Sequence, residues 1–265
     1  MNGSGEALRL LQAYDFEHQL DLRPWIVDYW RTSFPMVVVY LLLIFMGQRV
    51  MKGRSGYNLR LPLMLWSLSL AIFSILGMVR TWGFMKAVLL WGGLKQSVCF
   101  SRFHNDPVIR FWSFLFAASK VIELGDTAFI VLRKQRLLFL HWFHHSTVLI
   151  YTWYAYKDSV AGGGWFMTMN YGVHAFMYSY YTARAAGLRV PRPCAMLITV
   201  LQILQMAGGM TVNGLNWFWL QDRNCYTSQD QLFWASSMYL AYLALFLHFF
   251  HQAYFRGRAG KTKGE

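Results

Sequence analysis

The sequence predicts an all-α integral membrane protein with seven transmembrane helices. Of its 265 residues, 56% are hydrophobic and only 14% are charged, against the roughly 25% charged residues of an average soluble domain. The apolar residues lie in long runs, and most Lys and Arg residues lie in short clusters between those runs. Since no polar, Pro-rich or low-complexity stretch divides the chain, we expect one membrane domain over residues 1–265.

A helix that crosses a bilayer needs about 20 mainly apolar residues. Runs of this kind cover 33–51, 61–79, 111–132, 137–156, 163–183, 195–216 and 232–254, which together give a seven-helix core over 33–254. The stretch 83–94 is too short and too interrupted to span, so we expect a re-entrant or interfacial segment there. Residues 1–32 are polar and amphipathic and carry no cleavable signal.

The net charge of +13 indicates topology rather than nucleic-acid binding, because the basic residues are clustered between apolar runs. One set of connections is rich in Lys and Arg and lacks acidic residues. The tail 255–265 belongs to the same side and adds one acidic residue, Glu265. The connections on the opposite side contain both basic and acidic residues. The positive-inside rule therefore predicts a cytosolic tail and a lumenal segment 1–32.

Two features of the predicted lumenal side agree with this orientation. Asn2-Gly3-Ser4 is an acceptor triplet for N-glycosylation at Asn2. Cys99 and Cys225 both fall on the lumenal side, where a disulfide between them would persist, whereas Cys194 falls on the cytosolic side. Three unpaired thiols remain the alternative.

Ionisable residues inside spans are costly and are functional candidates by default. His141, His144 and His145 occupy positions i, i+3 and i+4, so their imidazoles share one helical face. In the preceding span, Lys120 and Glu123 are spaced for an ion pair, which is structural in one interpretation. In the other, Glu123 or Asp126 accepts a hydrogen bond from an imidazole.

Two later spans carry further polar groups, namely Asn170, His174, Tyr178 and Tyr181 in one and Thr199, Gln202 and Gln205 in the other. In an alternative interpretation the tyrosines form an interfacial belt and the glutamines join helices. Counted from the basic clusters at about 1.5 Å per residue, His144, Asp126, His174 and Gln202 lie at similar depths. This convergence predicts a site in the cytosolic half of the membrane.

The histidine cluster fits two kinds of chemistry. Membrane oxidases hold two irons with several histidine boxes, but this chain has eight histidines, and His18 and His104 lie on the wrong side. A site that holds a single metal ion remains an alternative. In the second kind, a neutral imidazole attacks a thioester, and the acyl-imidazole survives where water is excluded.

Four segments resemble the signature boxes of the very-long-chain fatty acid elongase family, in order and spacing. They are Lys120–Thr127, His141–His145, His174–Tyr181 and Thr199–Gln205. The run Ala161–His174 is similar to the branch that elongates saturated and monounsaturated long chains. The resemblance covers nearly the whole chain.

The resemblance implies an endoplasmic reticulum enzyme in which six of the seven helices form a barrel around an acyl tunnel. Such an enzyme condenses a long-chain acyl-CoA with malonyl-CoA to give 3-ketoacyl-CoA, CO2 and CoA, without metal or other cofactor. The tail Lys261–Glu265 is similar to a dilysine retrieval signal. Partners would be membrane lipid, further elongation-cycle enzymes and a second copy of the chain, and nucleic acid is not expected.

The family's roles carry over to matching residues. His144 would be the nucleophile, with His141, His145 and His174 positioning groups and moving protons. Asp126 and Glu123 would orient imidazoles. Substrate binding would involve Lys120, Tyr181 and the groups that stabilise enolate or oxyanion charge, Asn170, Tyr178, Gln202 and Gln205. Candidates for the CoA phosphates are Arg133, Lys134, Arg136 and Arg189.

Two other classes compete with the enzyme. A metal-dependent lipid oxidase would contain stoichiometric iron. A seven-span receptor or transporter would bind a ligand without turnover and leaves the histidine cluster unexplained.

Overall fold

The computed structural model describes residues 12–19, 23–99, 106–222 and 225–256, and these form helices with no strand among them. The helices are α2 (Asp15–Gln19), α3 (Arg23–Tyr29), η1 (Trp30–Thr32), α4 (Ser33–Met51), α5 (Arg60–Cys99), α6 (Pro107–Ile122), α7 (Gly125–Leu132), α8 (Phe139–Asp158), α9 (Gly163–Ala185), α10 (Arg192–Phe218), α11 (Gln229–Phe250) and η2 (His251–Arg256). Asn2, His104 and the tail 257–265 lie outside the described residues.

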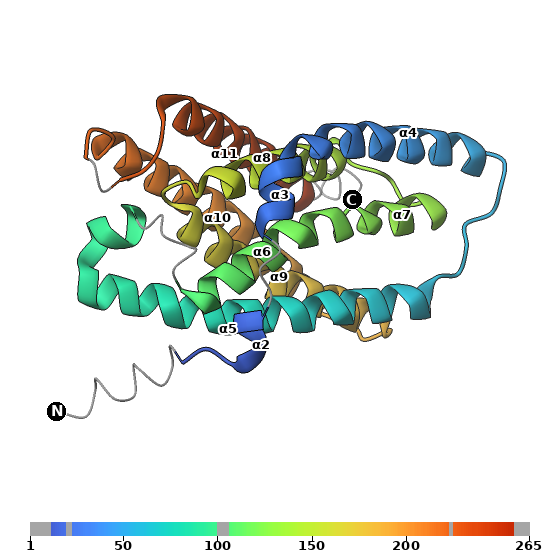
Figure 1. Ribbon diagram of the computed structural model, residues 1–265. Coiled ribbons are helices and arrows are strands. Elements are labelled where there is room, and N and C mark those ends of the chain that lie inside the picture. The colour runs from blue at the N-terminus through green and yellow to red at the C-terminus, as the bar shows by residue number, and fades with distance from the viewer. Residues whose placement is uncertain (1–11, 20–22, 100–105, 223–224, 257–265) are drawn as a thin grey trace.

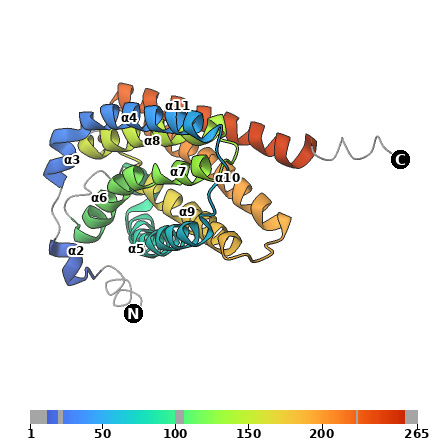
Figure 2. The same cartoon turned by 90° about the vertical axis from the view of Figure 1, so that its right-hand side faces the viewer.

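Figures 1 and 2 show the long helices lying side by side, with α5 along one side and α4 and α11 along the opposite side. Between them lie α6, α7, α9 and α10. Large apolar side chains such as Leu42, Leu43 and Leu204 point outward and are more than half exposed. A surface of this kind is stable against lipid rather than water.

Among the described residues, four helical stretches are long and apolar enough to cross a membrane: Trp25–Met51, Arg60–Cys99, Arg192–Phe218 and Gln229–Phe255. Helices α8 and α9 have 20 and 23 residues, which is sufficient length, but they carry the polar groups found by the sequence analysis. The chain is therefore an all-α integral membrane protein.

Helix α5 differs from the sequence prediction. The re-entrant or interfacial segment predicted at 83–94 is wrong as a separate element, because α5 continues from Arg60 through Gly92. The helix is kinked at Gly93, and a second short helical stretch follows it to Cys99. The only non-helical backbone inside α5 is Gly93, with φ 75°, a left-handed conformation that glycine adopts without steric cost. Glycines inside a helix cost only about 1 kcal/mol each relative to alanine, so Gly83 does not end it.

The predicted span 111–132 is also divided, into α6 and α7. At the junction the N–H groups of Leu124 and Asp126 donate to the carbonyls of Val121 and Glu123, three residues back. A side chain at Gly125 would lie 2.7 Å from the Trp66 ring, so the glycine lets α5 approach. The junction places Glu123 and Asp126 toward the interior.

Cys99 and Cys225 form a disulfide that joins the end of α5 to the segment before α11. Both cysteines are buried together with Ala161 and partly buried Trp219. Cys194 is exposed and unpaired. The structure thus contains the bridge and not the alternative of three free thiols.

Glu17 of α2 connects the N-terminal segment to α5 and α6 through hydrogen bonds. Its carboxylate is fully buried and accepts hydrogen bonds from Arg80 (Nη2, 2.5 Å), Trp112 (Nε1, 2.8 Å) and the Tyr14 N–H (2.9 Å). Burial raises the pKa of Glu17, but these hydrogen bonds, that from Arg80 foremost, outweigh it and hold the pKa below its ordinary value of 4.5.

We expect Glu17→Gln to lower the free energy of unfolding by about 3 kcal/mol, because it removes the buried carboxylate charge that pairs with the Arg80 guanidinium. The folded-state pKa is lowered, so the difference from wild type is complete above pH 4.5 and shrinks as pH falls through the folded-state value. Thermal unfolding in detergent across this pH range measures it. A constant difference at all pH values would contradict the assignment.

Candidate active site

A cavity of about 640 Å³ opens into the helix bundle, and we call it the polar cavity. Its lining brings together groups from the four signature segments and from helices α7 to α11. The sequence-predicted residues on its wall are Asp126, His141, His144, His145, Asn170, His174, Tyr178, Tyr181, Gln202, Gln205, Arg133 and Arg136. Separate helices thus contribute the predicted polar groups to one cavity.

The three histidines of α8 all face this cavity. The ring centroids of His141 and His145 are 4.4 Å apart, and those of His144 and His145 are 5.5 Å apart. The His141 Nε2 atom lies 3.0 Å from the Thr127 hydroxyl, which in turn contacts the Tyr40 hydroxyl at 2.8 Å. These two hydroxyls fix the orientation of the His141 ring.

A buried ion pair lies beside the histidines. The Lys120 Nζ donates to the Glu123 carboxylate at 2.8 and 3.1 Å and to the Asn170 Oδ1 at 2.9 Å. Ser119 donates to the same carboxylate at 3.0 Å. The His174 Nδ1 lies 3.7 Å from the Glu123 Oε1, so Glu123 faces an imidazole but does not accept the predicted hydrogen bond from it.

Asp126 has a different partner from the one that the sequence predicted. Its carboxylate accepts hydrogen bonds from the Trp66 Nε1 at 2.6 Å and the Tyr178 hydroxyl at 2.7 Å. Both oxygens are thus engaged by side chains other than histidine. Asp126 therefore positions Tyr178, whose ring packs edge-on against His174 at 5.4 Å.

The predicted basic residues separate into two groups. Arg133 and Arg136 line the polar cavity, together with Arg184, which the sequence analysis did not place in the site. Lys134 instead donates to the backbone carbonyls of Lys52 and Arg54, and Arg189 does not line the cavity. Of the four residues predicted to contact the CoA phosphates, Arg133 and Arg136 therefore lie at the polar cavity, and the other two do not.

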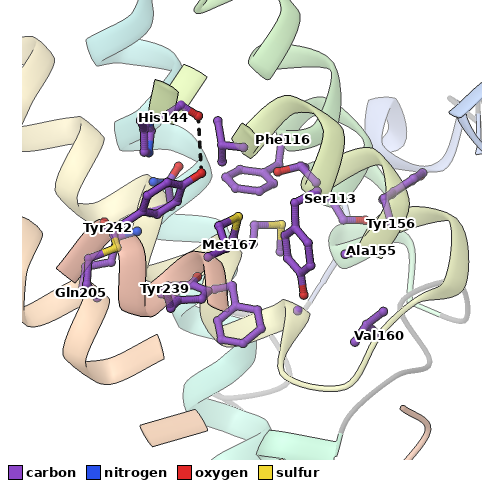
Figure 3. Close-up of a pocket in the computed structure, with 18 of the residues that line it drawn as sticks. Ser113, Phe116, His144, Ala155, Tyr156, Val160, Met167, Gln205, Tyr239 and Tyr242 are labelled. Atoms are coloured by element: carbon purple, nitrogen blue, oxygen red, sulfur yellow. Dashed lines mark hydrogen bonds between the residues drawn. The ribbon is translucent and has the colours of Figure 1, made fainter. Parts of the chain in front are cut away.

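A second, narrow cavity of about 90 Å³ continues from the first. Its wall is mostly apolar and follows α8 through Val148, Thr152 and Ala155 to the turn at 159–163. Figure 3 shows His144 and Val160 near opposite ends of it, with Phe116 and Met167 between them. Four residues line both cavities: His144, Asn170, Gln205 and Met206.

His144 therefore sits at the junction of a wide polar space and a narrow apolar one. Its ring packs against Tyr242 with centroids 4.8 Å apart, and Tyr242 bonds to the Thr147 hydroxyl at 2.6 Å. Sequence reasoning missed Tyr242, because a tyrosine in an apolar helix gives no local signal. Within the described residues, no group of three His, Cys, Asp or Glu side chains is arranged to hold a metal ion.

Comparison with known proteins agrees with this architecture. The model of the GNS1/SUR4 (ELO) family matches residues 25–262. Very long chain fatty acid elongase 3 of Homo sapiens is 55% identical over 100% of this chain and 98% of its own length. Elongase 6 of Homo sapiens is 54% identical over 96% and 97%, and elongase 6 of Drosophila melanogaster is 44% identical over 94% and 80%.

A family model over most of the chain, together with relatives that match along their whole length, defines the class. This integral membrane protein belongs to the GNS1/SUR4 family.

The Lys120–Glu123 pair gives a stability prediction. Lys120→Met leaves the buried Glu123 carboxylate without its counter-ion and should lower the free energy of unfolding by about 3 to 5 kcal/mol. The double variant Lys120→Met/Glu123→Gln removes both charges and should recover most of this loss. Thermal unfolding in detergent compares the two, and equal losses would contradict the pairing.

Proposed function

We propose that this protein condenses long-chain fatty acyl-CoA with malonyl-CoA to give 3-ketoacyl-CoA, CO2 and CoA, the first step of fatty acid elongation. The proposal is supported by family membership and by relatives named very long chain fatty acid elongases at 54–55% identity. The observation that carries it is the position of His144, where the polar and narrow cavities meet. The two cavities match the two unlike halves of an acyl-CoA.

In the first half-reaction the acyl chain enters the narrow cavity and CoA remains in the polar cavity. This places the thioester carbonyl at the junction, beside His144. A ring nitrogen of His144 forms a bond to the carbonyl carbon, the carbon–sulfur bond breaks, and CoA leaves as its thiolate. The acyl-imidazole is protected because the apolar wall excludes water.

In the second half-reaction malonyl-CoA replaces CoA in the polar cavity. Loss of CO2 leaves its electron pair on the α-carbon as an enolate, which attacks the acyl carbon and releases His144. Asn170 and Gln205 also lie at the junction. Because Lys120 donates to the Asn170 Oδ1, the Asn170 amide keeps its N–H groups to stabilise oxyanion charge.

The remaining groups fit supporting roles. His141, His145 and His174 move protons near the junction, while Tyr178 and Gln202 contact substrate from the polar cavity wall. Arg133, Arg136 and Arg184 line the same cavity and suit the phosphates of CoA. The chemistry as written needs no metal or other cofactor.

The proposal includes the topology. Seven helical spans cross the membrane of the endoplasmic reticulum and six of them surround the acyl tunnel, with the N-terminus lumenal and the C-terminus cytosolic. The arginine-lined end of the cavities then faces the cytosol, where acyl-CoA is supplied. The disulfide lies near the opposite end, on the oxidising side. Asn2 would be glycosylated there, and other elongation enzymes and a second copy remain expected partners.

Intact mass tests the covalent step directly. Purified protein mixed with palmitoyl-CoA, without malonyl-CoA, should gain the mass of one acyl group and release CoA. His144→Ala should show no adduct, and His248→Ala, outside both cavities, serves as the matched histidine control that retains it. If wild type turns over with malonyl-CoA but never shows an adduct, the acyl-imidazole step is wrong.

The arginines give a second test of the same site. Arg184→Ala should raise the KM for acyl-CoA roughly tenfold, as expected for loss of a hydrogen bond to a charged group, with kcat changed less. Arg189→Ala removes the same charge from a residue that does not line the cavity. Equal KM values for the two variants would show that only general surface charge matters.

A further inference from the structure

We propose that the Cys99–Cys225 disulfide sets the longest acyl chain that the enzyme accepts, by holding in place the turn that ends the narrow cavity. The inference rests on the proposed function, because it takes the narrow cavity as the acyl site. It adds a specificity role for a pair of residues that touch no reacting group.

The turn lies at the end of the narrow cavity opposite His144. It connects α8 to α9 over residues 159–163, and Ser159, Val160 and Gly163 line the cavity. Val160 is 4% exposed and Ala161 is fully buried. Figure 3 shows Val160 at the far edge of the cavity, so an acyl chain that grows along α8 meets this turn.

The backbone of the turn is held by the immediate neighbours of the two cysteines. The Gly162 N–H donates to the carbonyl of Val98 at 2.7 Å, next to Cys99. The Ala161 N–H donates to the carbonyl of Tyr226 at 3.1 Å, next to Cys225. The disulfide joins segments 126 positions apart in the sequence. It therefore holds the Val98 and Tyr226 carbonyls close together, where both can accept hydrogen bonds from the same turn.

Side chains of α10 close the remaining space behind the turn. The Asn216 Nδ2 donates to the Ala161 carbonyl at 3.2 Å. Gly162 has φ +84°, and a side chain there would lie 2.8 Å from both Val212 Cγ1 and Asn216 Nδ2. The turn is therefore packed from behind by α10 and cannot retreat unless α10 moves or the hydrogen bonds to the disulfide-linked segments break.

The distance from His144 to the turn corresponds to a long acyl chain. From His144 to the end of α8 at Asp158 the helix rises about 21 Å. Extended sp³ chains advance roughly 1.2 Å per bond, as the extended backbone does, so this axial distance equals the length of an extended chain of about 17 bonds. A longer chain would have to push the turn outward, which a close-packed wall resists.

The test compares acyl-CoA lengths on one preparation before and after reduction. Dithiothreitol forms two S–H groups at Cys99 and Cys225 and is itself oxidised to its cyclic disulfide, and thiol labelling confirms the reaction. Elongation of palmitoyl-CoA by the untreated protein tests the proposed function by itself. We expect reduction to raise the rate with behenoyl-CoA relative to palmitoyl-CoA roughly fivefold or more, because the extra carbons no longer have to be forced against a fixed wall.

Matched variants test the same inference without a reductant. Cys99→Ala/Cys225→Ala should show the raised ratio without reductant. Cys194→Ala keeps the disulfide and should behave as wild type, with the low ratio before dithiothreitol and the raised ratio after it. Asn216→Ala removes a hydrogen bond to the turn and should raise the ratio partly. Asn213→Ala, one helical turn earlier on α10 and not bonded to the turn, should leave it unchanged.

Each outcome of the reduction experiment either supports or overturns the role of the disulfide in chain-length selection. A raised ratio in the reduced protein supports the inference even where the double cysteine variant does not fold. An unchanged ratio in confirmed reduced protein overturns it. Equal loss of activity with every chain length also overturns it, because the disulfide would then support the fold as a whole rather than the end of the cavity.

Discussion

The ion pair between Lys120 and Glu123 connects the parts of the site, because a charge buried in a membrane helix bundle has to be matched where it lies. Glu123 is held by Lys120 and Ser119, Lys120 also bonds to Asn170, and His174 stands next to the same carboxylate. One pair thus links α6, the α6–α7 junction and α9. Their relative positions are fixed on the side of the bundle where the histidines of α8 converge.

The junction between α6 and α7 is part of the same arrangement. The backbone stays helical at Glu123 and Leu124, and only the hydrogen bonds shorten to three residues, so Glu123 and Asp126 remain neighbours on the helix. In the structure Glu123 faces Lys120 and His174, while Asp126 faces Trp66 and Tyr178. The two carboxylates, although close in the sequence, thus have separate sets of hydrogen-bond donors. Gly125, packed against Trp66, permits the approach of α5 that this separation needs.

The two cavities suit the two parts of a substrate that has a charged half and a hydrocarbon half. Three arginines and four histidines line the wide cavity, and the wall of the narrow one is mostly apolar. Only four residues belong to both, and His144 is the one among them whose side chain can act as a nucleophile. Chemistry at the boundary keeps the charged part of the substrate near water and the reactive acyl group away from it.

Much of the site could be predicted from the sequence, because its signals are local. The spacing of His141, His144 and His145 places them on one helix face, and the basic clusters and long apolar runs indicate membrane helices. The similarity of depth between His144, His174 and Gln202 follows from the rise of a helix alone. For these residues short-range geometry is sufficient.

The tertiary structure decided what depends on contacts between distant segments. The partner of Asp126 is a tryptophan 60 positions away, and no spacing rule connects the two. The extension of α5 to the kink at Gly93 and the tight junction after α6 depend on packing, since glycine is compatible with either a continued or an interrupted helix. The sequence by itself therefore determined which polar groups lie in the membrane and how deep they lie. Which of them meet, and where the narrow cavity ends, was decided by helix packing, because those distances are set between helices rather than along them.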